Sequence, residues 1–308
     1  MAHVGPPPRS APIGMARRVY STVGFTKGYN FVLWLIFLGA FFLFTLARLQ
    51  YLDFHGVFCS STVRSSYNHA APGECFYLLQ QPYKLGILLH LAGTLPAALL
   101  VCLQFIPVIR HKFPKLHAIV GYIVIILSIM SVAGIWIILP RSFGGGLDVQ
   151  VFIALSSTAF LWALFKAMSS IKYRRIGQHR AWMLRAWFWA GCIVTGRIIH
   201  IVGLKASLFA FPDYIMPCDK IDSMLGDRTL NLYPQCASFY SGENLGQSVA
   251  VCPEFNHFTS RVEVAAALDS SFGTAYLIAL LLHVVGLEIY LRLTTSKTRC
   301  LRVVSSDR

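Results

Sequence analysis

Acidic residues are scarce in this chain. Aspartate and glutamate contribute 13 of its 308 residues, and all charged residues together make up 13% of it, whereas soluble domains average about 25%. Hydrophobic residues make up 56%, and the mean hydropathy is +0.59. This composition excludes an ordinary soluble domain and is typical of a protein that crosses a membrane several times.

Sequence motifs that identify common cofactors and nucleophiles are also missing. The chain has no dinucleotide-binding fingerprint, P-loop, CxxCH motif or GxSxG elbow, and no cysteine or histidine spacing resembles a zinc site. The three glycines of RSFGGG at 141–146 do not match a phosphate-binding motif and are interpreted as a short turn. No cofactor and no metal are therefore predicted.

Six continuous apolar runs have the length of membrane spans. Each is near the ~20 residues that cross a bilayer, and continuous rather than alternating hydrophobicity favours helices over strands. The predicted fold class is all-α, a polytopic membrane helix bundle of about six transmembrane helices. The runs cover 31–49, 85–108, 117–139, 150–168, 181–203 and 272–293.

Positive charge is concentrated in alternate segments between these runs. Four segments hold fifteen lysines and arginines and one acid, whereas the three that alternate with them hold seven bases and eleven acids. This positive-inside pattern predicts that both termini are cytosolic. Topology thus explains the net charge of +14, and no nucleic-acid partner is predicted. The basic segments are 1–30, 109–116, 169–180 and 294–308, and the others are 50–84, 140–149 and 204–271.

The segments outside the runs have distinct predicted structures. The Pro-rich residues 1–30 are expected to be a disordered cytosolic arm, and residues 294–308 a basic cytosolic tail. Between them, the six-span domain 31–293 carries two cysteine-bearing outer loops at 50–84 and 204–271. The second loop has about 68 residues, too many for a simple connector, so we expect it to form a small ordered cap.

Cysteines cluster in these two loops. Five of the eight lie there, which indicates an oxidising side of a eukaryotic endomembrane or plasma membrane and one or two disulfide bonds. The simplest pairing joins Cys59 to Cys75 and two of the three residues Cys218, Cys236 and Cys252.

Helical spacing assigns a polar face to four of the runs. The second, third, fifth and sixth runs each gather small, polar and aromatic residues on one stripe, as a helix turned toward a protein interior requires. We predict that these spans form the core of the bundle. The first and fourth runs have no such stripe and are predicted to be peripheral.

The ionisable residues on these stripes are candidates for function, because such groups are expensive in hydrocarbon. Arg197 and His200 share a face three residues apart, and His90 lies at a similar depth on a facing helix. The predicted catalytic residues are His90, Arg197, His200 and His283, and the predicted substrate-binding residues are Trp182, Trp189, Gln104 and Tyr276. A second candidate cluster, near the cytosolic boundary, comprises His117, His179 and Arg185.

Structural roles compete with these assignments. Arg197 is close enough to the outer interface to extend toward it or to bond a carbonyl of the cap, and a lone membrane histidine often bonds a neighbouring helix. Glu288, the one carboxylate inside a predicted span, is expected to pair with Arg292 at i+4. Asp269 and Glu263 precede the last run and are placed to reach a site from the outer side, although nothing in the sequence fixes this.

A haem site is the specific alternative. Histidines on different helices at one depth can ligate haem iron from two sides, and His90 with His200 meets this requirement. His179 and His200 are 21 residues apart, about 31 Å of helix, which argues against a relay of two stacked haems.

Two segments, KLHAIVGYIVIILSIMSVAG and QHRAWMLRAWFWAGCIVTGRIIH, carry a resemblance. The chain resembles a large family of predicted integral membrane proteins, found in bacteria and multiplied in fungi, that is catalogued as a domain of unknown function. The likeness covers about 85–205, and the cysteine-bearing loop and the span HVVGLEIYLR are similar to the fungal branch. The resemblance implies the fold and no particular reaction. Its signature residues are His117, Gly121, His179, Arg180, Trp182, Met183 and Arg185.

The leading hypothesis is a membrane-embedded enzyme of specialised metabolism. By analogy with fungal pathway proteins of similar size, it would cyclise or isomerise a lipophilic metabolite, prenylated ones included, by acid/base chemistry. A haem-b electron-transfer protein and a transporter or non-catalytic membrane partner are the alternatives. The substrate, the organelle and the oligomeric state do not follow from the sequence.

Overall fold

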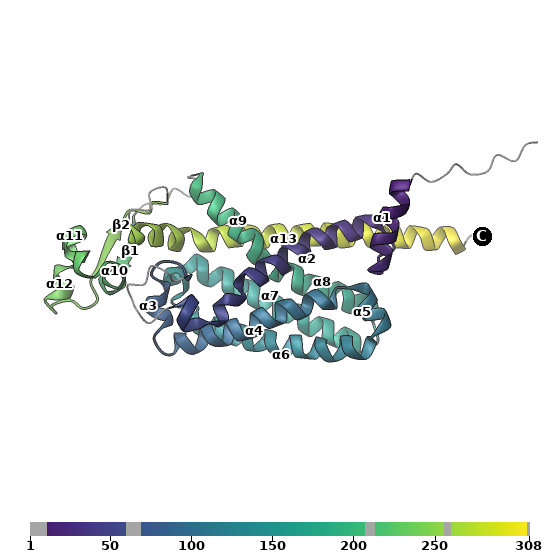
Figure 1. Cartoon of the computed structure of the whole chain (residues 1–308), viewed down its shortest axis with the longest axis horizontal. Helices are drawn as coiled ribbons and strands as arrows, with labels where there is room; N and C mark the ends of the chain where they lie inside the picture. The colour runs from purple at the N-terminus through teal and green to yellow at the C-terminus, as the bar shows by residue number, and fades with distance from the viewer. Residues whose placement is uncertain (1–10, 60–68, 207–212, 256–259, 307–308) are drawn as a thin grey trace, which may run out of the picture. The chain divides into compact units, whose positions relative to one another are not determined.

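The computed structural model describes residues 11–59, 69–206, 213–255 and 260–306. Six helices or helix pairs in these ranges are long and apolar enough to cross a membrane, which confirms the all-α polytopic bundle (Figure 1). They are α2 (Gly28–Arg48) with η1 (Leu49–Leu52), α4 (Tyr83–Gln104), α6 (Pro114–Ile138), α7 (Leu147–Lys172), α8 (Ile176–Ala190) with α9 (Cys192–Lys205), and the first part of α13 (Arg261–Ser306).

The N-terminal arm differs from the expectation. Residues 11–22, expected to be disordered, form a helix, and residues 1–10 lie outside the described ranges. Short helices and turns connect the spans. The helix α1 (Ala11–Thr22) precedes the first span, and the connecting elements are η2 (Phe54–Phe58), α3 (Glu74–Leu78), α5 (Pro107–Lys112) and η3 (Ser142–Gly145).

The chain divides into two compact units, and α4 and α6 contribute a segment to each. The first unit comprises residues 1–49 and 92–128, and the second comprises 50–91 and 129–308. In the first unit, the backbone N–H of Val108 donates to the carbonyl of Val23 at 3.3 Å, which seats the N-terminal segment on the start of α5. The second unit contains the features that define a site.

The core of the second unit lies between α7, α9 and α13. Its buried residues include Val149, Phe152 and Ile153 of α7, which pack with Phe272 and Tyr276 of α13. The fourth span is therefore not peripheral, and that expectation was wrong. Its buried residues are mostly apolar, with Ser157 and Ser170 as the exceptions, so hydropathy alone does not distinguish this stripe from a lipid-facing one. We call this group, together with Cys192, Ala275, Ala279 and Leu280, the helix core.

The fifth span is two helices rather than one. The helical pattern is interrupted at Gly191, and α8 and α9 are separate elements in Figure 1. The single stripe expected along residues 179–200 is thus divided. The part of the stripe after Gly191, with Arg197 and His200, follows the axis of α9 alone.

Two glycines set the crossing of α4 and α6 in the second unit. A side chain on Gly86 would lie 2.9 Å from the carbonyl oxygen of Gly134, and one on Gly134 would lie 2.6 Å from the backbone nitrogen of His90. Small residues at both positions let the helix backbones approach closely. This approach places His90 against Ser131 of α6.

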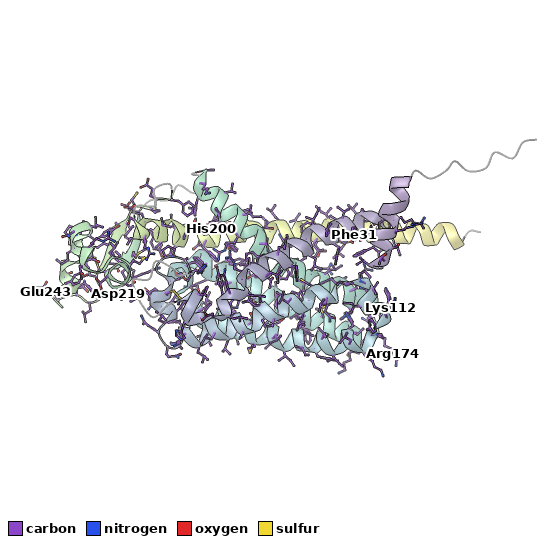
Figure 2. The ribbon with its side chains drawn as sticks, in the orientation of Figure 1. Phe31, Lys112, Arg174, His200, Asp219 and Glu243 are labelled. Atoms are coloured by element: carbon purple, nitrogen blue, oxygen red, sulfur yellow. A yellow bond between two sulfur atoms is a disulfide. The ribbon has the colours of Figure 1, made fainter. Side chains whose placement is uncertain are left out.

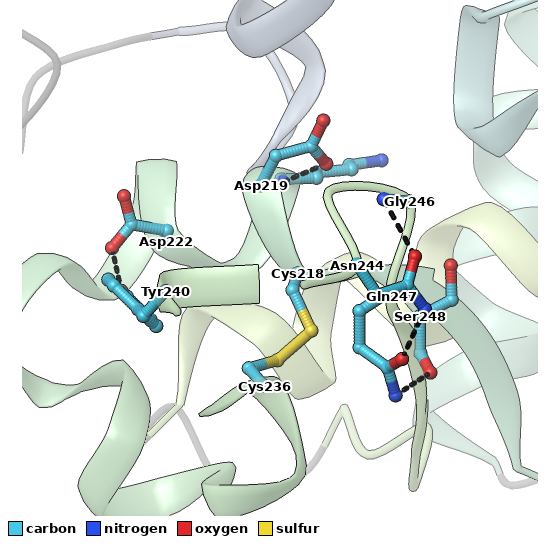
Figure 3. The surroundings of a disulfide bond; sticks show 10 residues. Cys218, Asp219, Asp222, Cys236, Tyr240, Asn244, Gly246, Gln247 and Ser248 are labelled. Carbon is cyan, nitrogen blue, oxygen red and sulfur yellow. Dashed lines mark hydrogen bonds between the residues drawn. A yellow bond between two sulfur atoms is a disulfide. The ribbon is translucent and has the colours of Figure 1, made fainter. Parts of the chain in front are cut away.

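The long loop after α9 folds into an ordered cap, as predicted. Two antiparallel strands, β1 (Tyr214–Pro217) and β2 (Ser248–Val251), pair with Tyr214 opposite Val251. A buried cluster and a disulfide between Cys218 and Cys236 hold the cap together (Figure 3). The first loop contains the predicted Cys59–Cys75 bond, and Cys252 is free and exposed. The other cap elements are α10 (Cys218–Leu225), η4 (Gly226–Arg228), α11 (Thr229–Leu232), η5 (Pro234–Cys236) and α12 (Ala237–Tyr240).

The last helix begins earlier than its hydropathy indicated. The sequence places the span at 272–293, whereas α13 starts at Arg261. Polar residues in its first turns, Asp269 and Ser271 among them, lower the hydropathy, yet both are buried. Their partners lie inside the protein.

Candidate functional site

Three side chains from Asp, Glu, Lys and Arg are buried in the described part of the chain, and they form one cluster. The Nζ atom of Lys220 lies 2.7 Å from Oδ2 of Asp269 and 3.7 Å from Oε1 of Glu74. The three side chains are 2%, 1% and 7% exposed, respectively. Charged residues are almost never buried this far unless they are paired. We call Glu74, Lys220 and Asp269 the acid cluster.

Each member of the acid cluster comes from a different element. Glu74 is the first residue of α3 and adjoins Cys75, which is bonded to Cys59. Lys220 lies in α10, two residues after the disulfide-bonded Cys218. The third member belongs to the long helix α13. The two loop residues are therefore held close to covalent crosslinks, and the third by a membrane helix.

The turn between α6 and α7 supplies a further contact to Glu74. The backbone N–H of Phe143 donates to Oε2 of Glu74 at 3.0 Å. Phe143 has φ of +46°, a left-handed conformation that is rare for an aromatic residue, and Gly144 follows with φ of +73°. A side chain at Gly144 would collide with the hydroxyl group of Tyr214. Such a backbone persists only where its surroundings hold it, and here it directs an N–H at the carboxylate.

The acid cluster has one cation for two carboxyl groups. Burial, followed by the nearby Asp269 carboxylate, raises the pKa of Glu74 to about 7, against the opposing effects of Lys220 and the Phe143 N–H. Burial alone disfavours the charged form of Lys220, but the carboxylates of Asp269 and Glu74 outweigh it and raise the pKa of that ammonium group. Lys220 therefore stays charged while Glu74 gains and loses a proton near neutral pH. Such a carboxyl group suits a general acid.

Two oxygens of the acid cluster accept no hydrogen bond. Oε1 of Glu74 and Oδ1 of Asp269 are buried and without such a partner among the described residues. The 3.7 Å between Nζ of Lys220 and Oε1 of Glu74 is too long for a hydrogen bond, so that attraction is purely Coulombic. Both carboxyl groups thus retain an acceptor position.

Three aromatic rings continue from the acid cluster into the helix core. Phe143 stacks on Phe272 with centroids 3.8 Å apart, and Phe272 stacks on Tyr276 at 4.1 Å. The ring of His200 meets the last two edge-on, at 5.8 and 6.1 Å, and the guanidinium carbon of Arg197 lies 5.9 Å from the Phe143 centroid. We call the three rings the aromatic stack. It brings together three residues that the sequence predicts for the site: Arg197, His200 and Tyr276.

His200 lies on α9 (Figure 2) and is fully buried, and its hydrogen bond to Ser271 indicates its tautomer. Its Nε2 lies 2.8 Å from the hydroxyl oxygen of Ser271, which itself donates to the carbonyl of Ala267 at 2.6 Å. Because that hydroxyl hydrogen is already used, the Ser271 oxygen accepts and Nε2 of His200 donates. Nδ1 is then the nitrogen that can take up a proton.

Two other predicted catalytic residues are held by hydrogen bonds to neighbouring helices. His283 contacts the carbonyl of Phe188 through Nδ1 at 2.6 Å and the hydroxyl of Thr195 through Nε2 at 2.8 Å. Nδ1 of His90 lies 3.0 Å from the hydroxyl of Ser131. Both ring nitrogens of His283 are therefore occupied. Within the described ranges, no hydrogen bond or ring contact joins His90 to the histidine beside the aromatic stack.

The predicted substrate-binding residues lie in different places. Trp189 packs against the helix core, whereas the ring of Trp182 lies 4.6 Å from the guanidinium of Arg185. Gln104 belongs to the first unit, beside Gly121. Tyr276 alone is part of the aromatic stack.

Arg185 and His179 of the second candidate cluster have different partners. Arg185 makes two hydrogen bonds to Glu288, at 2.6 and 2.9 Å. Nδ1 of His179 contacts a backbone carbonyl of α7 at 2.9 Å, and His117 belongs to the first unit. The hydrogen-bonded partner of Glu288 is thus Arg185 on another helix, and the expected partner Arg292 contributes only a weaker Coulombic attraction. No spacing in the sequence reveals a pair of opposite charges on two different helices.

Sequence reasoning missed most of the acid cluster. Glu74 and Lys220 lie in loops without helical periodicity, and Phe143 lies in a turn interpreted as a simple connector. The available signals were their neighbours: each loop residue lies within two positions of a predicted disulfide cysteine, and the turn contains three glycines. Asp269 was noted as able to reach an outer site, without a partner.

No group of three or more histidine, cysteine, aspartate or glutamate residues arranged for a metal ion occurs in the ranges that the structure describes. The haem alternative, with His90 and His200 as ligands, stays a prediction. Both imidazoles already hydrogen-bond to serine hydroxyls on neighbouring helices, so no observation favours it.

The fold and this site define a polytopic helical membrane protein with disulfide-bonded loops and a buried acid cluster. The family described as "Predicted membrane protein (DUF2306)" matches residues 87–219, which confirms the resemblance noted from the sequence. The chain is also similar to a protein of Aspergillus versicolor described as "Ava biosynthesis cluster protein G", with 23% identity over 324 aligned residues, 92% of this chain and 94% of that protein. No solved structure matches the chain.

Proposed function

We propose that this protein is a membrane-embedded enzyme of specialised metabolism that cyclises or isomerises a lipophilic metabolite, prenylated ones included, by acid/base chemistry. Similarity to a biosynthesis cluster protein supports the metabolic setting. One observation carries the chemistry: the acid cluster keeps the carboxyl group of Glu74, with a pKa of about 7, beside a fixed cation.

In this scheme the protonated carboxyl group of Glu74 is the acid. It transfers its proton to an oxygen or an alkene carbon of the metabolite, and Lys220 and the N–H of Phe143 stabilise the carboxylate that remains. The π-faces of the aromatic stack stabilise the positive charge that develops on the metabolite. Ring closure or double-bond migration then moves that charge within the same molecule.

His200 is the base that completes the proton balance. The metabolite loses a proton to Nδ1 of His200, so substrate and product have the same composition. After product release, this proton leaves to solvent and Glu74 takes one up, which restores the starting state. His90 was predicted to share the role, but it bonds Ser131 and has no part in this scheme.

The topology we propose places both termini in the cytosol. The six candidate spans and the basic segments at the termini support this arrangement. The disulfide-bonded loops, and with them the acid cluster, then face the oxidising side of an endomembrane or the plasma membrane.

Metabolite profiling of Glu74→Gln tests the proposed function. The gene is deleted in its source organism and restored as wild type, Glu74→Gln or the control Glu243→Gln, which removes an exposed carboxylate of the cap. Because a general acid contributes at least about 100-fold, we expect the wild-type product to fall to trace amounts in Glu74→Gln. An isomer of equal mass should accumulate, as measured by liquid chromatography and mass spectrometry of membrane extracts.

Protein level and intact disulfides are checked by non-reducing electrophoresis, since glutamine can still accept the Phe143 hydrogen bond and should preserve the fold. A wild-type product level in Glu74→Gln would overturn the proposal. So would an unchanged isomer ratio with an altered distribution between cells and medium, which is the result expected of a transporter.

A further inference from the structure

Arg197 is a cation in a membrane-spanning helix, and no described residue supplies its counter-charge. No ion pair and no hydrogen bond involve its guanidinium group within the described ranges, and its Nε is buried without a partner. Its printed neighbour is the face of Phe143, at 5.9 Å. The other deeply placed cations of the second unit differ, because Arg185 pairs with Glu288 and Lys220 joins the acid cluster.

Among the residues that the structure describes, no carboxylate of the cap or the spans pairs with Arg197. The buried carboxylates Glu74 and Asp269 are already occupied by Lys220. An unpaired charge in a low-dielectric environment is strongly disfavoured, so intramembrane ionisable residues usually mark a site for a substrate or an ion. Arg197 is half-buried with its Nε buried and unpartnered, and a negative charge from outside the chain would satisfy it.

A second buried donor packs against the same helix core. The indole N–H of Trp189 makes no hydrogen bond to any residue that the structure describes. Trp189 and Phe143 both pack against the helix core, and Arg197 lies over Phe143. Buried polar groups are rarely left unsatisfied. Two unsatisfied donors around one apolar core indicate a ligand with oxygen acceptors.

We propose that Arg197 binds the anionic head group, a carboxylate or a phosphate, of a lipophilic ligand. Planar guanidinium groups bind both kinds of anion through paired hydrogen bonds. If the proposed function holds, this ligand is the substrate, which is then an amphiphilic acid and not a neutral hydrocarbon. Phe143 contacts Arg197 with its ring and Glu74 with its backbone, so a head group on Arg197 places the chain of the ligand beside the acid.

Binding to purified full-length protein in detergent tests this inference without requiring turnover. The probe is 11-(dansylamino)undecanoic acid, whose fluorescence reports binding, and the competitors are dodecanoate, dodecyl phosphate and methyl dodecanoate. We expect the wild type to bind at least one anion about tenfold or more tightly than the neutral ester. Whether dodecanoate or dodecyl phosphate competes better identifies the head group.

Arg197→Gln should lose this preference, and Arg197→Lys should retain part of it, because the lysine charge remains without the paired donors. The control is Lys166→Gln, which removes another span cation that also lies over an aromatic ring, at 4.8 Å from Trp162. It should bind like the wild type. Each variant is first shown to be monodisperse by size-exclusion chromatography.

Equal affinity of the wild type for anion and ester, no binding of any competitor, or an unchanged preference in Arg197→Gln would overturn the inference. Glu74→Gln separates it from the proposed function. If Glu74→Gln keeps both full binding and full product formation, the acid role of Glu74 is wrong but the anion site stands. If Arg197→Gln binds the anions with the wild-type preference while Glu74→Gln forms no product, the anion site is wrong but the acid role of Glu74 stands.

Discussion

Two groups of paired acidic and basic side chains in the second unit differ in their burial and in their balance of charge. Arg185 and Glu288 have equal and opposite charges, form two short hydrogen bonds, and are 19% and 37% exposed. The acid cluster is almost fully buried and contains one base for two acids. The balanced, partly exposed pair links two helices. An unbalanced buried cluster keeps a carboxyl group that can hold a proton, and this difference separates a structural link from a site.

The largest effect is expected from removing the cation of the acid cluster. Lys220→Met leaves two carboxyl groups buried without a base, and breaking a buried pair in this way costs about 3–5 kcal/mol. We expect a large drop in thermal stability of the protein in detergent at neutral pH, measured by the fraction that stays monodisperse after heating. Glu74→Gln added to Lys220→Met should recover much of it.

Lys205→Met, which removes an exposed lysine at the end of α9, is the matched control and should change the stability by less than about 0.5 kcal/mol. A Lys220→Met protein as stable as this control would show that the acid cluster is not electrostatically coupled.

A smaller effect is expected from the Arg185 pair. Because both side chains are partly exposed, Arg185→Gln should lower the stability by about 1 kcal/mol. The double variant Arg185→Gln/Glu288→Gln should be no worse than the single one, as measured by the same heating assay. Product formation should be unaffected. A loss as large as that of Lys220→Met would remove the distinction between the two sites.

Hydropathy and charge were sufficient to predict the spans, the disulfide between Cys59 and Cys75, and the ordered cap. These features follow from local composition, because a span needs a long apolar run and a disulfide needs an oxidising loop. Arg197 and His200 also attract attention in the sequence, since an ionisable residue in an apolar run is conspicuous, and their role in a site stays a prediction.

The acid cluster was beyond such reasoning for a physical reason. Glu74 and Lys220 look like ordinary loop charges, and their burial beside Asp269 is what raises the pKa of Glu74. The polar start of α13 was excluded from the span because hydropathy treats every polar side chain as facing water. The interruption at Gly191 likewise has no signal in a periodicity that assumes one continuous helix.

The direction of the pH dependence follows from the raised pKa of Glu74. It rises from an ordinary 4.5 to about 7 in the folded protein. Between these values the folded protein keeps the proton and the unfolded chain releases it. The contribution of Glu74 to stability is therefore complete below pH 4.5 and is lost as the pH rises toward 7. A carboxylate in a balanced salt bridge behaves in the opposite way.

Infrared titration of the Glu74 carboxyl group tests the central claim most directly. The C=O stretch of a protonated carboxyl group is followed against pH in the wild type and in Glu74→Gln, and the difference isolates this residue. We predict a band that disappears with a midpoint near pH 7. A midpoint near the ordinary value of 4.5 would contradict the account. Identical spectra of the wild type and Glu74→Gln between pH 4.5 and about 7 would contradict it as well.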